Sequence, residues 1–220
     1  MQLARLKSSL ARAGCTAHYR TVFAAAGLGP RELRDLTVMS RLALTTKADL
    51  RANYAFGLLR CRAIGLCRFI PRPGRRSKRR WSAYTAGDQK IWTSLMERSL
   101  RAAGVVASDI AHLSYGCGLS NGGLGVHYGA EAMGCMVLQS AAGMTPRLVT
   151  LIEDFGATVI GSTPSYMLVI LNEYRARGRD PAQSSLRNGV FDSEPWINAM
   201  RVEIGTAFIM QAIDCLGCQR

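Results

Sequence analysis

The sequence predicts an α/β protein: a helical N-terminal segment followed by alternating strand–helix units that form a mainly parallel sheet. Beyond residue 86, short apolar runs alternate with amphipathic stretches about five times, at intervals of roughly 20–25 residues, as right-handed crossovers require. Glycines and Thr-Pro pairs mark the ends and beginnings of these stretches. At 220 residues and 48% hydrophobic, the chain can bury a substantial core.

The N-terminal segment, up to about residue 58, is expected to be helical. Leu3, Leu6 and Leu10 share one helical face, which favours an amphipathic first helix over a transit peptide. Thr46 and Asp49 have the spacing of a capping box. There is neither a secretory leader nor an 18-residue apolar run, so the expected location is the cytoplasm.

The remaining elements follow in order along the chain. Thr-Pro pairs at 145–146 and 163–164 are expected to begin helices as N-cap and first residue, and Gly104 and Gly156 to end them. The expected strands are 110–115, 135–138, 157–161, 187–191 and 211–215, and the expected helices are 88–103, 123–133, 145–155, 163–177 and one that begins at 194. Because ligands bind at the carboxyl ends of parallel strands, we expect the site on loops 116–124, 139–145, 162–166 and 192–195.

The net charge of +13 comes mostly from one segment. Residues 60–80 contain nine lysines and arginines and no acid. Such a run either binds nucleic-acid phosphates, here through residues 68–80, or is a solvated loop. We interpret residues 60–83 as a basic, disordered loop and keep nucleic-acid binding as the alternative.

The seven cysteines form no regular framework, and their odd number favours free thiols in a reducing compartment. Cys215 and Cys218 form a C-x-x-C pair that Cys61 and Cys67 would complete as a zinc site, but one such pair near the end is a weak signal. No metal site is therefore predicted. The histidines show no acid or nucleophile partner and are interpreted as structural: His18, His112 and His127.

Four stretches of the sequence resemble one family of enzymes. They are LTTKADLRANYAFGLL (44–59), LSYGCGLSNGGLGVHYGAEAMG (113–134), TPSYMLVILNEY (163–174) and SSLRNGVFDSEPWINAMR (184–201). Together they resemble the phenylacetate–CoA ligases of the adenylate-forming superfamily. The resemblance implies a helical segment at 1–59, the foreign basic loop at 60–83, an incomplete adenylate-forming domain at 84–220, and no C-terminal small domain.

The resemblance also implies a reaction and its partners. An aryl carboxylate attacks the α-phosphate of Mg-ATP, giving an acyl-adenylate and pyrophosphate, and the thiol of CoA then displaces AMP. The implied ligands are thus a phenylacetate-like acid, ATP, Mg²⁺ and CoA.

The site residues follow from the resemblance position by position. The implied acid-binding residues are Tyr115, Cys117, Gly118, Ser120, Gly122, Gly123, Thr163, Pro164, Ser165 and Tyr166. The implied nucleotide-binding residues are Ser193, Glu194, Pro195, Asp214 and Gly217. Four positions depart from the family pattern: Cys117 and Ser120 replace Tyr and Phe, and Asp192 and Ser193 replace Gly and Ala.

The phosphate loop departs most. RPGRRSKRRWSA (72–83) has the length of the family loop, but only Gly74 and Lys78 match. Equal length with foreign content indicates a compensated frameshift, and the last residues lack the Mg²⁺-binding carboxylate of the family. The catalytic residues are therefore unknown, and we expect a truncated, frameshifted and inactive form of the ligase.

Overall fold

The computed structural model describes residues 2–29, 32–54, 56–60, 65–72, 80–115, 121–140 and 143–215. The chain divides into two compact units, Met1–Ala86 and Gly87–Arg220. Within the described ranges, no helix is long and apolar enough to cross a bilayer.

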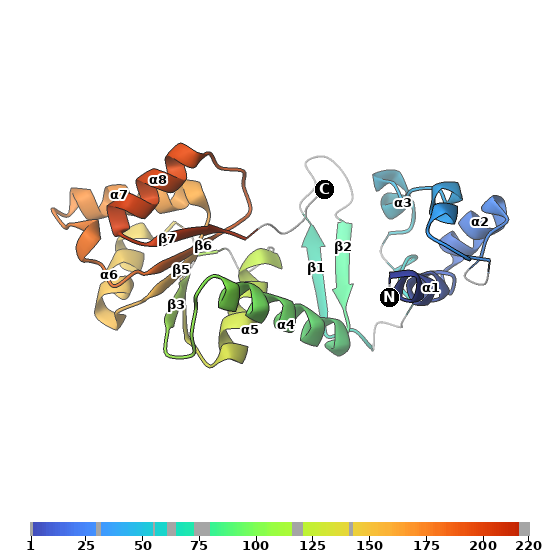
Figure 1. Cartoon of the computed structure of the whole chain (residues 1–220), viewed down its shortest axis with the longest axis horizontal. Helices are drawn as coiled ribbons and strands as arrows, with labels where there is room; N and C mark the ends of the chain where they lie inside the picture. Colours follow the sequence, from blue (N-terminus) through green and yellow to red (C-terminus); the bar gives the residue numbers. More distant parts are fainter. Residues whose placement is uncertain are drawn as a thin grey trace. The chain divides into compact units, whose positions relative to one another are not determined.

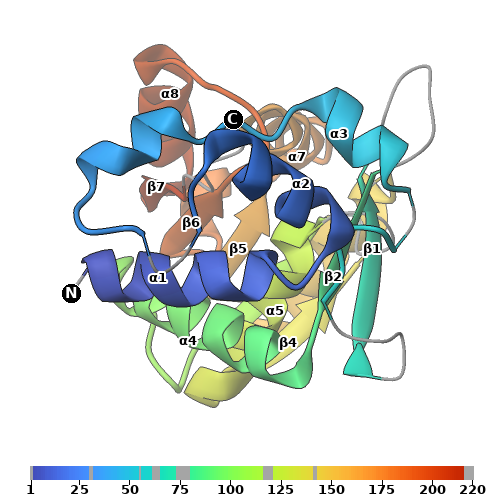
Figure 2. The same ribbon diagram turned by 90° about the vertical axis from the view of Figure 1, so that its right-hand side faces the viewer.

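The first unit begins with helices α1 (Gln2–Ala13), α2 (Ala17–Ala26) and α3 (Lys47–Ala52), with a 3-10 helix at Thr37–Arg41 (Figure 2). The predicted capping box is present at α3. The hydroxyl of Thr46 accepts a hydrogen bond from Asp49 N at 3.2 Å, and the Asp49 carboxylate accepts one from Thr46 N at 2.7 Å. Both orphan donors at this helix start are thereby satisfied.

The segment expected to be a basic loop contains two paired strands, so that expectation is wrong for part of its length. Strands β1 (Arg68–Arg72) and β2 (Arg80–Tyr84) pair antiparallel, with Arg68 opposite Tyr84 and Arg72 opposite Arg80. Their sequences, RFIPR and RWSAY, contain the aromatic and β-branched residues that favour strands. The charge of the segment alone does not predict these strands.

The second unit is built on one five-stranded parallel sheet. Its strands are β3 (Ile110–Leu113), β4 (Met136–Gln139), β5 (Val159–Ser162), β6 (Asn188–Phe191) and β7 (Gln211–Asp214), in the order β4-β3-β5-β6-β7. The helices are α4 (Ala86–Ala102), α5 (Asn121–Met133), α6 (Thr145–Phe155), α7 (Pro164–Ala176) and α8 (Asn198–Phe208). The predicted fold class is confirmed.

Four helix starts differ from the expected ones. Helix α4 begins at Ala86 and not at 88, and helix α5 begins at Asn121, inside the expected loop 116–124. Helix α6 has Met144 as N-cap, and Thr145 is its first residue. Helix α8 begins at Asn198 and not at 194.

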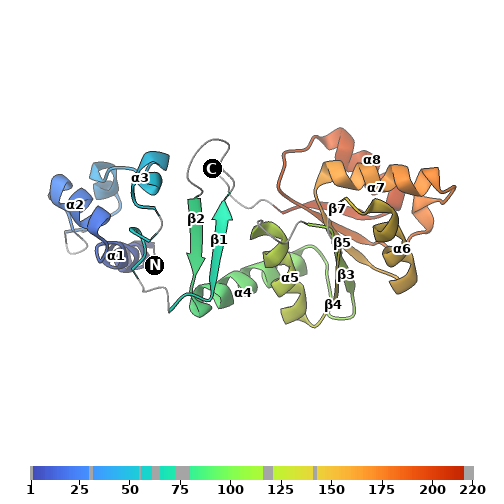
Figure 3. The same ribbon diagram turned by 180° about the vertical axis from the view of Figure 1, so that it is seen from behind.

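Helices cover both faces of the sheet (Figures 1 and 3). Helices α4 and α5 pack on one face around Leu100, Val126 and Leu113, and α6 to α8 cover the other around Ile152 and Ile160. Glycines let α5 approach α4 closely: a Cβ at residue 125 would lie 2.8 Å from the indole of Trp92, and one at residue 129 would lie 2.8 Å from Cβ of Met96. Part of the glycine content of α5 therefore serves packing.

Candidate active site

The strand order places a topological switch point between β3 and β5. The chain leaves β3 for β4 on one side, then returns across β3 to β5, β6 and β7 on the other. Connections from β3 and β5 therefore diverge outside their carboxyl ends, which is where open α/β sheets bind ligands. Tyr115 follows β3 at this point, and Thr163 follows β5.

Tyr115, an expected wall of the acid pocket, is directed into the sheet core. It is 4% exposed, and its hydroxyl donates a hydrogen bond to Val190 O at 2.9 Å. Burial, and then the nearby acidic groups, raise the pKa of this phenol above its usual value. Beside it, the backbone N–H and hydroxyl of Ser114 both donate to Gly161 O, at 2.9 and 3.0 Å. The ends of β3, β5 and β6 are thus tied together.

The loop after β5 begins helix α7 with a side-chain cap. Thr163 is the N-cap, and its hydroxyl accepts a hydrogen bond from Tyr166 N at 3.3 Å, while Pro164 is the first helical residue. The next free N–H, at Ser165, donates to the carboxylate of Glu194 at 2.5 Å. A carboxylate at a helix N-terminus is stabilised by the helix dipole. An expected acid-binding residue and an expected nucleotide-binding residue are therefore in direct contact.

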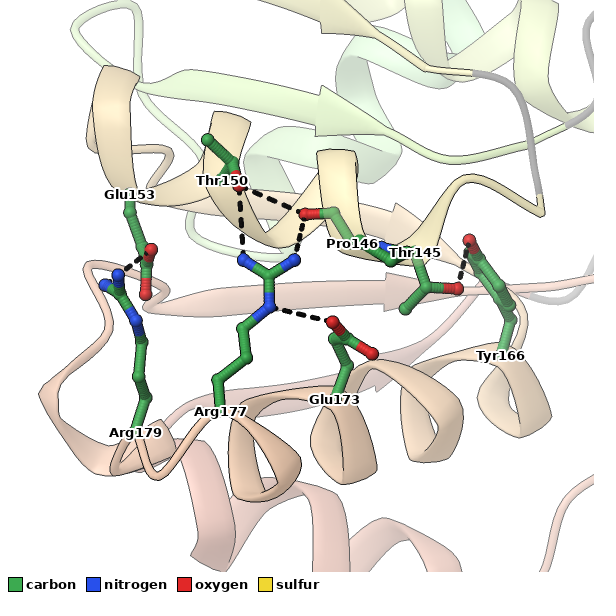
Figure 4. A network of polar contacts seen from close by, with 8 residues as sticks. All are labelled: Thr145, Pro146, Thr150, Glu153, Tyr166, Glu173, Arg177 and Arg179. Carbon is green, nitrogen blue, oxygen red and sulfur yellow. Dashed lines mark hydrogen bonds and ion pairs between the residues drawn. The ribbon is translucent and has the colours of Figure 1, made fainter.

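The loop after β4 is joined to the same place through Tyr166. Its hydroxyl accepts a hydrogen bond from Gly143 N at 3.2 Å and shares one with the hydroxyl of Thr145 at 3.1 Å (Figure 4). The loops after β4, β5 and β6 thus form one hydrogen-bonded rim. The hydroxyl of Thr145, which was expected to cap its own helix, is hydrogen-bonded to Tyr166 instead.

A clamp farther along α7 holds that helix against α6. The guanidinium of Arg177 donates to the carboxylate of Glu173 at 2.7 Å, to Thr150 Oγ1 at 3.2 Å and to Pro146 O at 2.6 Å (Figure 4). This clamp fixes the direction of α7 and so the position of its N-terminus at the rim.

The expected nucleotide-binding loop after β6 contains a strained residue. Ser193 has a φ of 79°, in the region that residues with a Cβ seldom occupy. Asp214 ends β7 with its carboxylate 3.9 Å from the guanidinium of Arg201, which lies 4.9 Å from the ring centroid of Trp196. Strain that persists beside a ligand-binding edge is typical of functional loops.

Two polar residues lie under the rim, one of which, His112, was not expected to belong to the site. His112, interpreted from sequence as structural, is fully buried, and its Nε2 lies 2.9 Å from Ser140 Oγ. Burial lowers its pKa to about 4. Ser162, the last residue of β5, is also fully buried. The signal available in the sequence was the strand alternation, which places both side chains on one face of the sheet.

Several expected site residues lie outside the described part of the chain: Gly74, Lys78, Cys117, Gly118, Ser120 and Gly217. Gly122 and Gly123 belong to the first turn of α5. Of the cysteines weighed as zinc ligands, the thiol of Cys67 donates to Tyr84 O at 3.3 Å, Cys215 is in no disulfide, and Cys61 and Cys218 are outside the described ranges. Across those ranges, no group of three or more potential metal ligands gathers.

The sequence is similar to three curated enzymes along nearly all of its length. It is 40% identical to a phenylacetate-coenzyme A ligase of Aromatoleum evansii over 218 residues, which is 99% of this chain and 50% of that one. The corresponding ligases of Pseudomonas putida and Escherichia coli K12 are 39% and 41% identical, covering 98% and 90% of this chain and 49% and 46% of theirs. The chain spans about half the length of the curated relatives it matches. No protein-family model matches it.

Solved structures show the same fold. The open conformation of 2-hydroxyisobutyryl-CoA ligase, in complex with 2-HIB-AMP and CoA, superposes with a TM-score of 0.89 at 22% identity, over 98% of this chain and 52% of that one. The anthranilate CoA ligase AuaEII, in complex with anthranoyl-AMP, gives a TM-score of 0.56 at 17% identity, over 83% and 38%. The alternative of nucleic-acid binding gains no support from these proteins.

Proposed function

We propose that this chain, which belongs to the phenylacetate–CoA ligase family, binds an aryl carboxylic acid and the adenosine part of ATP at the carboxyl edge of its sheet. The observation that carries the proposal is the rim itself. Loops that resemble the ligases in sequence meet there through the Ser165–Glu194 and Tyr166–Gly143 hydrogen bonds. In the complete reaction of such a ligase the acid is activated by ATP and transferred to CoA.

The acid has a suitable position at the switch point. The positive dipole end of α7 at the rim favours a carboxylate nearby, beyond the N–H groups of residues 165–167, which already donate to Glu194 and Thr163. Residues 163–166 and the first turn of α5 would line that position, with Tyr115 supporting it from the core. Aryl ring contact would come from these apolar and aromatic groups.

The residues of the rim fit the nucleoside better than the phosphates. Residues 143–145, 163–166 and 192–195 include no lysine or arginine but do include Asp192 and Glu194. Carboxylates accept hydrogen bonds from ribose hydroxyls and an adenine amino group, whereas they repel phosphate. Asp192, Glu194 and Asp214 are thus the residues that would hold the nucleoside.

Phosphate and Mg²⁺ contacts would have to come from elsewhere. In the family they come from a loop that corresponds to residues 72–83, where only Gly74 and Lys78 agree. Charge stabilisation and positioning of the phosphates supply most of the rate in phosphoryl chemistry. The proposal is therefore that the chain as given binds acid and nucleoside without adenylating at an ordinary rate, and that CoA binds only to a complete ligase. Because ATP and CoA are cytoplasmic, so is the proposed location.

Calorimetric titration of the full chain tests the binding. Phenylacetate and AMP should each bind, and Glu194→Gln should weaken AMP binding by about tenfold, because a charge-assisted hydrogen bond is lost. The matched control is Glu203→Gln, an exposed residue of α8, which should leave binding unchanged. If neither ligand binds, the proposal is wrong.

Pyrophosphate release tests the second half of the proposal. With Mg-ATP and phenylacetate, release should stay far below ordinary enzyme rates of roughly 1–10³ s⁻¹. A rate in that range would contradict the proposal. The frameshift hypothesis is tested separately by sequencing the coding DNA, which should restore a glycine-rich phosphate loop if the hypothesis is right.

A further inference from the structure

Two buried polar atoms under the rim have no hydrogen-bond partner among the described residues. They are Nδ1 of His112 and Oγ of Ser162. Both residues are 0% exposed. Native proteins pair nearly all such atoms with protein, water or ligand, so an unpaired one calls for a specific explanation. Two of them on neighbouring strands at a ligand-binding edge point to one shared explanation.

The register places the two side chains on the same face of the sheet. His112 on β3 is paired with Ile160 on β5, and Ser162 is two residues farther along β5. Ile160 belongs to the core under α6 to α8, whereas Leu113, next to His112, belongs to the core under α4 and α5. Because side chains alternate along a strand, His112 and Ser162 both face α6 to α8.

The pair lies near the strand ends that lead into the expected acid-binding residues. Ser162 immediately precedes Thr163, the N-cap of α7, and His112 is three residues before Tyr115. The other ring nitrogen of His112 is held by Ser140, which follows β4. Ser140, His112 and Ser162 therefore come from three adjacent strands, β4, β3 and β5, across the switch point.

The chemistry of the pair matches a hydroxyl group. Burial lowers the pKa of His112 to about 4, so the ring is neutral near pH 7 and carries one N–H. Whether Nδ1 donates or accepts depends on the hydroxyl of Ser140, which can do either, and the hydroxyl of Ser162 can also do both. A hydroxyl is a group that donates and accepts at once. An unsubstituted aromatic ring would leave both atoms unpaired.

We propose that His112 and Ser162 form a polar floor in the acid site that selects a hydroxylated aryl acid over phenylacetate. This inference rests on the proposed function and names the substrate class of the same site. Both side chains are 0% exposed, so the group that satisfies them is a hydroxyl of a ligand or of a water molecule held between the rim and the sheet. A hydrogen bond made in such surroundings discriminates strongly, because the analogue without the hydroxyl leaves polar atoms unpaired.

The test compares phenylacetate with its 2-, 3- and 4-hydroxy derivatives, titrated into the full chain by calorimetry. At least one hydroxylated acid should bind about tenfold more tightly than phenylacetate, the effect of one buried hydrogen bond. In Ser162→Ala this preference should disappear while phenylacetate affinity is retained. Because the hydroxyl of Ser162 bonds to no described residue, the variant should keep its unfolding temperature or raise it. His112→Gln should also reduce the preference.

Ser185→Ala is the matched control. The hydroxyl of Ser185 donates to Ala157 O at 2.7 Å, before the start of β6 and away from the rim. This variant should lower the unfolding temperature and leave the preference intact. Equal affinity for all four acids, with phenylacetate bound, would overturn the polar floor but not the proposed function. A large loss of stability in Ser162→Ala would show a partner for the hydroxyl and would also overturn it. If no acid binds, both proposals fail.

Discussion

Replacing Gly161 with alanine should destabilise the second unit through a clash at the switch point. A Cβ at residue 161 would lie 2.7 Å from Cδ2 of Leu113 and 3.0 Å from Cε2 of Tyr115. Neither neighbour can easily move aside, because Leu113 is 0% and Tyr115 4% exposed. Adding one methyl group to such a core costs about 1–3 kcal/mol.

The clash has a second consequence, at the Tyr115 hydroxyl. If the ring shifts, its hydrogen bond to Val190 O breaks, which leaves buried polar groups unpaired at a cost of about 1–3 kcal/mol. The lower entropy of the unfolded alanine chain returns only about 0.4–1 kcal/mol. The free energy of unfolding of Gly161→Ala should therefore fall by about 2–4 kcal/mol.

Urea unfolding followed by circular dichroism measures this change, with an unaltered m-value as the sign that only stability changed. Gly205→Ala, inside α8 with its nearest atom, Met210 O, at 3.3 Å, is the control and should stay within about 1 kcal/mol of the parent. A double-mutant cycle with Tyr115→Phe should show a combined loss smaller than the sum. An unchanged stability of Gly161→Ala, or full additivity in the cycle, would refute the reasoning.

Three further predictions concern local backbone, pH and helix packing. Ile209 follows the last turn of α8 with φ 50° and ψ 44°, a left-handed conformation that favours glycine, and it is 74% exposed. Ile209→Gly should therefore raise the free energy of unfolding by about 1 kcal/mol, whereas Val202→Gly inside α8 should lower it. Burial lowers the pKa of His112 to about 4, below its unfolded value, so protonation favours the unfolded state. The free energy of unfolding should therefore fall by up to about 3 kcal/mol as the pH falls from about 6.5 to 4. Urea titrations should show this loss in the parent and not in His112→Gln. Arg177→Met should lower the free energy of unfolding in urea by about 1–2 kcal/mol, because the three hydrogen bonds of this clamp residue are lost. Arg179→Met breaks one exposed ion pair and should lower it by less than about 1 kcal/mol.

Local signals were sufficient to predict the alternation of the second unit. Thr163 caps α7 as expected, and Gly104 and Gly156 have the positive φ values, 81° and 63°, that a helix end favours. The expectation of a disordered loop was wrong at β1 and β2, on either side of residues 73–79, because it rested on the charge of the segment and not on its aromatic and β-branched residues. It also failed at Thr145, whose hydroxyl bonds to Tyr166 across 21 residues and does not cap its helix.

The assembly of the site was beyond local sequence signals. Glu194 and Ser165 are 29 residues apart, and Tyr115 and Val190 are 75 apart, so neither contact follows from periodicity or turn chemistry. Each depends on which strands become neighbours and in what register. The sequence did predict that these loops would share one edge, because all strands of a parallel sheet end on the same side.

The structure gives a physical reason why ligand binding and catalysis can be separated in this chain. Every described contact of the rim is made within Gly87–Arg220 and rests on the two cores of that unit. In the proposed function, acid and nucleoside recognition need only hydrogen bonds and apolar surface, which the rim and the proposed polar floor would supply. Transfer at phosphorus needs positive charge held at the phosphates, and the rim loops carry acids in place of lysine or arginine. Under the proposal, turnover is lost because residues 72–83 are rich in arginine but lack the glycine-rich phosphate loop of the family, and restoring turnover would require that loop.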